Sequence, residues 1–182
     1  VTGGSGLSAL NATNLTSGAV PAARMPAGSV IQTTDVNTGT TSTTIGTTED
    51  TMFDTVVTGD ITTVYDDSDV LIFVSVLTQI TNSTGDAGYT LRVKRHGSGV
   101  TTAYPNNLNE GTIANWHSTW YRNPADNPYE FVDRHYPMFL DSPSQATSLS
   151  YTVQVGGHAQ EALSIGGVYN ARWMIFFQEI KR

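Results

Sequence analysis

The chain has 182 residues, with 9 Lys and Arg against 16 Asp and Glu and a formal net charge of −7 at pH 7. This length suits one domain, and the negative balance repels phosphate backbones, which argues against nucleic acid as a partner. Only 14% of the residues are charged and none is Cys, so the surface is suited to neutral partners such as sugars, and disulfides and thiol chemistry are excluded.

Residues 1–27 are mostly Gly, Ser, Ala and Thr with isolated Leu and Val. This composition has no apolar period and predicts a linker, extended or only locally ordered, rather than part of a core. We expect the linker to give way to a β domain over 28–182. The Thr-rich run 37–51 favours extended backbone, either as a strand with polar faces or as a long loop.

Alternating apolar segments follow from residue 52, separated by turn-forming clusters such as DDSD, NSTGDAG and NPADNP. This spacing is typical of an all-β domain. The best helix candidate, HAQEALSIGG, is short. Strands are expected over 52–57, 60–65, 70–80, 89–96, 113–120, 130–140, 149–155 and 172–180.

The segments VLIFVSVL and RWMIFFQEI are apolar on both faces of the expected strand. A strand in an isolated two-layer sandwich has one face toward the core and one toward water. Both faces of these strands therefore require a cover, which is either a loop or the linker, or another copy of the chain. The sequence does not decide which face is the inner one. The side chains expected at a subunit contact are Leu71, Phe73, Leu77, Met174, Phe176 and Ile180.

Catalytic and metal-binding motifs are scarce. The four His residues lie far apart and do not have the spacing of a zinc site, and no phosphate-binding loop or nucleophile elbow occurs. The DDSD cluster lacks the Gly and distal Glu of a calcium loop, so it indicates a solvated turn. A carboxylate pair for glycoside hydrolysis could be drawn only from Glu110, Asp126, Glu130 and Asp133. We therefore predict no enzyme activity, no metal and no cofactor.

The region 103–136 is rich in Trp, Tyr, His, Asn and Pro. Aromatic rings flanked by amides and carboxylates stack on sugar rings and bind their hydroxyl groups, and such residues are also typical of protein-binding loops. The plainer interpretation is that the aromatic residues are ordinary core and that Asn and Pro mark turns. The candidate glycan contacts are Trp116, His117, Trp120, Tyr121, Asn123, Asp126, Asn127 and Tyr129.

Both ends of the chain resemble a known family. NLTSGAVPAARMPAGSVIQ resembles the linker that precedes a terminal β domain in tail fibres and spikes of bacteriophages, especially marine and cyanobacterial ones. MFLDSPSQATSLSYTVQV and ARWMIFFQEIKR resemble segments of that domain, the second its closing strand. The resemblance covers parts of the first third and most of the last third, and its motifs mark fold more than activity.

The resemblance implies a jelly-roll-like antiparallel β-sandwich on an extended N-terminal stalk, assembled as a homotrimer and located on the virion. In trimeric jelly rolls the third and last strands are neighbours on the inner sheet, and the doubly apolar segments occupy those places here. The region 103–136 departs from the family in being longer and more aromatic, so the resemblance does not supply the ligand.

We therefore expect a trimeric phage tail fibre or spike head that binds a host surface glycan, with other virion proteins attached through the N-terminal segment and no membrane insertion. A capsid decoration or fibre-joint protein is the first alternative, and burial of 116–129 between subunits would favour it. A glycan-degrading enzyme using Asp126, Glu130 or Asp133 is the second. A monomeric carbohydrate-binding module is the third.

Overall fold

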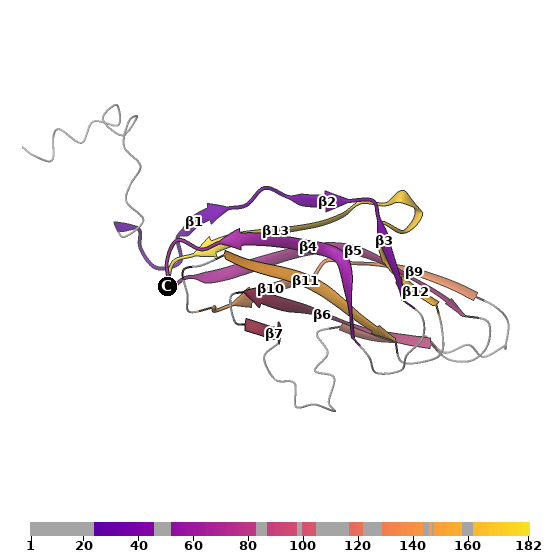
Figure 1. Ribbon diagram of the computed structural model, residues 1–182. Helices are drawn as coiled ribbons and strands as arrows, with labels where there is room; N and C mark the ends of the chain where they lie inside the picture. Colours follow the sequence, from indigo (N-terminus) through magenta and orange to yellow (C-terminus); the bar gives the residue numbers. More distant parts are fainter. Residues whose placement is uncertain are drawn as a thin grey trace, which may run out of the picture.

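The fold is described by a computed structural model over residues 24–45, 52–82, 87–97, 100–104, 117–121, 129–143, 146, 148–157 and 162–182. Within these ranges it consists of antiparallel strands arranged in two sheets, with a short 3-10 turn at Val168–Asn170. The sheets pack face to face as a sandwich (Figure 1). The all-β prediction is confirmed.

The first sheet has eight strands and is centred on the long strand β5. One edge of β5 pairs with β13 and then β12, and the other pairs with β10 and then β9. The members are β1 (Val30–Thr33), β2 (Asn37–Gly39), β3 (Ser42–Ile45), β5 (Asp69–Asn82), β9 (Tyr129–His135), β10 (Met138–Asp141), β12 (Ala162–Gly166) and β13 (Trp173–Ile180).

The second sheet has five strands, with β11 between β4 and β6, and with β7 and β8 both pairing with β6. From β4 onward the chain alternates between the sheets: β5, then β9 and β10, then β12 and β13 belong to the first sheet, and β4, then β6, β7 and β8, then β11 belong to the second. This antiparallel alternation is a jelly-roll-like topology, as the sequence predicted. The members are β4 (Phe53–Thr62), β6 (Ala87–Gly97), β7 (Val100–Tyr104), β8 (His117–Tyr121) and β11 (Ser148–Gly157).

Several predicted boundaries are wrong, each for a local reason. The expected strands 52–57 and 60–65 are one strand, because Gly59 does not form a turn. It allows the ring of Phe177 to pack closely against the backbone, since a Cβ at this position would lie 2.9 Å from that ring. The expected strand 130–140 is two strands, because Tyr136–Pro137 interrupts the pairing with β5 and proline has no N–H to donate. The described part of the helix candidate, Ala162–Gly166, is strand β12.

The core lies between the sheets and is built from one face of each strand. On β5 it takes Val70, Ile72, Val74 and Val76, and on β13 it takes Trp173, Ile175 and Phe177, all at most 5% exposed. The second sheet supplies residues such as Leu91, Tyr151 and Val153. The sequence predicted the alternation of these two strands, and the structure shows which alternate set is the core.

A buried ion pair connects the two sheets. Arg95 Nη1 on β6 donates to both carboxylate oxygens of Asp141 on β10, at 2.7 and 2.6 Å. Tyr151 Oη on β11 donates to the same carboxylate at 2.7 Å. Burial raises the pKa of Tyr151, and the charge of Asp141 and the hydrogen bond to it raise that pKa further, against the opposing effect of Arg95.

The raised pKa of Tyr151 predicts a loss of stability in alkali. Above pH about 10 the unfolded chain loses the Tyr151 proton while the folded chain keeps it, so this contribution is complete below that pH and declines above it. Tyr151→Phe should make the fall in unfolding free energy shallower by up to about 1.4 kcal/mol per pH unit. Urea unfolding between pH 8 and 11 measures this slope.

The described end of the linker is held against the C terminus (Figure 1). Gly28 N donates to Lys181 O at 2.7 Å, and Lys181 N donates to Ser29 O at 2.9 Å. Lys181 Nζ also donates to Met25 O at 2.9 Å. Residues 25–29 are therefore continuous with the domain edge, and the first 23 residues lie outside the described ranges.

Candidate functional site

The outer face of the first sheet, which points away from the core, carries a row of large apolar side chains. Because residues directly paired across antiparallel strands share a face, Met138 and Phe176 lie on the same side as their partner Phe73, and Leu140 on the same side as Leu71. Met138 is 61% exposed and Leu140 is 48% exposed. We call this surface the outer patch: Leu71, Phe73, Leu77, Met138, Leu140, Met174, Phe176 and Ile180.

All of the predicted subunit-contact residues belong to the outer patch, on β5 and β13. Met174 is exposed and the others are half-buried in the single chain. Met138 and Leu140 were missed, although the alternation in PMFLD is the same signal that identified the other strands. The sequence left open which face of each strand is not covered by the core of the chain itself. The structure shows that it is the face that carries the outer patch.

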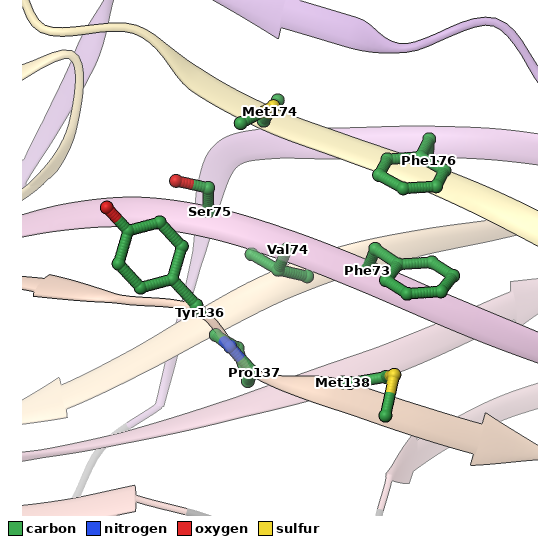
Figure 2. A pocket seen from close by; sticks show the side chains of 8 residues that line it. All are labelled: Phe73, Val74, Ser75, Tyr136, Pro137, Met138, Met174 and Phe176. Carbon is green, nitrogen blue, oxygen red and sulfur yellow. The ribbon is translucent and has the colours of Figure 1, made fainter.

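A groove runs along the middle of the patch (Figure 2). Its volume is about 320 Å³. The rings of Phe73 and Phe176 stack on adjacent strands, with centroids 4.5 Å apart and planes within 4°. Such a groove is suited to an apolar side chain of a partner, because only Ser75 and Tyr136 offer polar side-chain atoms. The lining is Phe73, Val74, Ser75, Tyr136, Pro137, Met138, Met174 and Phe176.

Charged groups border the outer patch without belonging to it. At one end Arg134 Nη1 donates to Ser75 Oγ and to the carbonyl of Arg172, both at 3.2 Å. At the other end Arg182 Nε lies 2.6 Å from Asp69 Oδ1. Because Arg134 is paired with Leu77 on this face, a partner that covers the middle of the patch buries apolar surface alone, whereas a partner that reaches Leu77 also covers the Arg134 guanidinium.

The outer face of the second sheet has the opposite character. Gln154 on β11 donates to Asp54 on β4 at 2.6 Å and accepts from Arg92 Nε on β6 at 2.7 Å. Burial lowers the pKa of Arg92, and the charge of Asp54 opposes this shift. The two outer faces of the sandwich thus differ, with hydrogen-bonded polar groups on one and large apolar groups on the other. Hydrophobic association is expected at the first sheet.

Beyond Leu77 the outer face of the first sheet carries polar groups beside Val132, which is paired with Gln79 and is 39% exposed. Gln79 Nε2 donates to Glu130 Oε1 at 2.8 Å, and the hydroxyl groups of Thr44 and Ser164 are 2.8 Å apart. Asp133, three positions after Glu130 on β9, pairs with the inward-facing Thr78. Glu130 and Asp133 therefore leave the strand on opposite faces and do not form the carboxylate pair of a glycosidase.

A hydrogen-bonded cluster lies inside the same end of the sandwich. Tyr89 Oη is 2.6 Å from His135 Nε2, and Thr78 Oγ1 is 3.0 Å from the same nitrogen. His135 is 7% exposed. Because Tyr89 belongs to the second sheet and the other two side chains to the first, the cluster joins the sheets as the Arg95–Asp141 pair does. We assign it a structural role.

The predicted glycan contacts lie only partly within the described residues. The backbone of β8 places positions 117, 120 and 121 beside β6 in the second sheet, and position 129 begins β9 in the first. The structure does not describe the side chains at these positions. Trp116, Asn123, Asp126 and Asn127 lie outside the described ranges.

The acidic turn DDSD is placed as predicted. Asp66 and Asp67 are exposed in a turn before β5, and Asp69 is bound by Arg182 and Ser142. Over the described part of the chain, the structure contains no group of three or more His, Asp and Glu side chains arranged to hold a metal ion. The same residues include no helix of the length and apolar character that a membrane span requires.

Comparison with known proteins yields a distant structural likeness. No family model matches the sequence, and no curated protein matches it either. A chain in the structure of infectious bursal disease virus, Gx strain, is similar with a TM-score of 0.36 and 13% sequence identity. The match covers 85% of this chain and 38% of that chain.

Proposed function

We propose that this chain is a structural, non-enzymatic domain of a phage virion appendage, assembled as a homotrimer whose head binds a host surface glycan. The observation that carries the proposal is the outer patch. It is a face of large apolar residues on a two-layer sandwich whose other outer face is polar. Contiguous apolar surface of this extent is typical of an interaction site.

A second copy of the chain is the partner that fits this surface best. The partner must present apolar side chains over several strands, and the chain itself has such a face. The net charge of −7 opposes association through most of the surface, whereas the outer patch has no charged side chain. Copies can meet at the middle of the patch, around Phe73 and Phe176, without burying an unpaired charge, and closed symmetric association is the common arrangement.

The motifs of the linker and of the closing strand support the virion part of the proposal. A glycan is the proposed ligand because the aromatic and amide-rich region 103–136 connects β7, β8 and β9, and binding residues are commonly placed on loops held by a rigid scaffold. Three heads on one particle would strengthen weak individual binding through avidity.

Trp120→Ala tests the ligand. We expect adsorption of the trimeric protein to host cells to fall by about tenfold or more, because a covered aromatic ring contributes about 1–3 kcal/mol to binding. Pull-down of fluorescent protein by cells measures adsorption, and sedimentation confirms that the trimer is intact. If an intact Trp120→Ala trimer adsorbs normally, Trp120 does not contact the glycan. Loss of the trimer would indicate a buried 116–129 segment and favour the fibre-joint alternative.

A further inference from the structure

The turn between β12 and β13 is held rigidly against the Thr-rich strand region. Gly167 N donates to Thr41 O at 2.8 Å, and Val168 is 4% exposed. A Cβ at Gly167 would lie 1.9 Å from Thr40 O, so only glycine permits this approach. Gly166 has φ +111°, which other residues rarely adopt. The contacts of Gly166, Gly167 and Val168 therefore fix the backbone of this turn, and the residue at its tip does not.

The tip of the turn presents an aromatic ring to solvent. Tyr169 is 66% exposed and has φ 54°, in the left-handed region, which is unfavourable for a large side chain. Asn170 follows with φ 59°, a conformation that Asn tolerates. Tyr169 thus occupies a position where glycine would be less strained, and its ring is not needed to fill the core.

Polar groups lie next to this ring on the outer face of the first sheet. Gln79 Nε2 donates to Tyr169 Oη at 3.3 Å and to Glu130 Oε1 at 2.8 Å. These bonds orient the phenol and the carboxylate together. No hydrogen bond within the described residues is recorded for Gln79 Oε1 or Glu130 Oε2. Two fixed acceptors and one exposed ring are therefore available to a ligand.

We propose that Tyr169, Gln79 and Glu130 form a binding site for a neutral pyranose. The apolar C–H face of the sugar stacks on the negative face of the phenol ring. Its hydroxyl groups donate to Gln79 Oε1 and to the Glu130 carboxylate, the latter as charge-assisted hydrogen bonds. The carboxylate disfavours acidic sugars, and a single ring does not form the aromatic cage that holds a quaternary ammonium ion.

This site is distinct from the 116–129 segment and does not depend on trimer formation. The site lies at the polar end of the sheet, beyond the outer patch, and all three of its residues belong to one chain. The sugar bound here is a second contact on the same head, which avidity would add to the first. Weak, millimolar affinity is expected for a single pyranose on an open surface.

Saturation-transfer NMR on the full chain tests the proposal, with methyl β-D-galactopyranoside, methyl α-D-glucopyranoside and methyl α-D-mannopyranoside as probes. At least one should receive saturation from the protein, and Tyr169→Ala should weaken this binding about tenfold or more. Tyr169→Phe keeps the ring and should stay within about threefold of the wild type. The sugar affinity of Glu130→Gln should lie between those of Tyr169→Ala and Tyr169→Phe. Binding that survives Trp120→Ala and is lost in Tyr169→Ala assigns the sugar to this site.

Three results would overturn the proposal: no transfer to any probe, transfer lost in Trp120→Ala and retained in Tyr169→Ala, or competition by tetramethylammonium at the Tyr169 site. Tyr169→Gly provides an independent readout. Because glycine relieves the left-handed strain, its melting temperature should equal or exceed that of the wild type while sugar binding is lost. A lower melting temperature would assign the ring to folding instead of binding.

Discussion

Phe73→Asp is expected to dissociate the proposed trimer at micromolar concentrations. Phe73 lies at the centre of the outer patch, stacked on Phe176 and beside Met138. An aspartate there would bury an unpaired charge in an apolar contact, which costs several kcal/mol, at each of the subunits. The association should therefore weaken by about a hundredfold or more. Sedimentation velocity over a range of concentrations measures the mass.

Gln79→Asp is the matched control for this substitution. Gln79 lies on the same strand and the same outer face, at its polar end, so the change adds the same charge outside the patch. It should leave the trimer intact. Phe73→Asp should also keep a cooperative thermal transition, because the side chain points away from the core residues Ile72 and Val74. A Phe73→Asp protein that remains trimeric would place the subunit contact elsewhere, and a monomeric wild type would refute the trimer itself.

The doubly apolar strands were predictable because alternation in a strand has a period of two residues. VLIFVSVL and RWMIFFQEI show two apolar sets, so the existence of a second apolar face needs no coordinates. Which set is the core depends on pairing with the second sheet, and that information is not local. The same test applied to PMFLD would have added Met138 and Leu140 to the predicted contact.

The errors arose where a residue has several structural roles. The predicted strand 130–140 ran through Pro137, which is a boundary, whereas the break predicted between 57 and 60 is not one, because Gly59 allows the ring of Phe177 to approach a continuous strand. ALSIG has helical residues but pairs with β3 and β5 on both edges, so tertiary pairing overrides propensity. The polar cluster of Gln79, Glu130 and Tyr169 could not be predicted, because it joins positions up to 90 residues apart.

The second large effect concerns the buried pair in the core. Asp141→Ala is expected to lower the free energy of unfolding by about 3–5 kcal/mol, because it leaves the Arg95 guanidinium buried without its counter-charge. Asp141 is 1% exposed and also accepts from Tyr151, so its removal takes a hydrogen-bond acceptor from two buried side chains at once. Chemical unfolding at neutral pH measures the loss.

Comparison with Asp69→Ala separates the contribution of burial to this loss of stability from the contribution of charge pairing alone. The Asp69–Arg182 pair has the same 2.6 Å distance as the Arg95–Asp141 pair, but Arg182 is 40% exposed. Its removal should cost about 1 kcal/mol or less. Replacing both buried partners, as in Arg95→Met with Asp141→Leu, should recover most of the stability lost in Asp141→Ala, since the main penalty is the orphaned charge and not the lost attraction. If the double variant is as unstable as Asp141→Ala, the carboxylate acts chiefly through Tyr151 and the connection between the sheets.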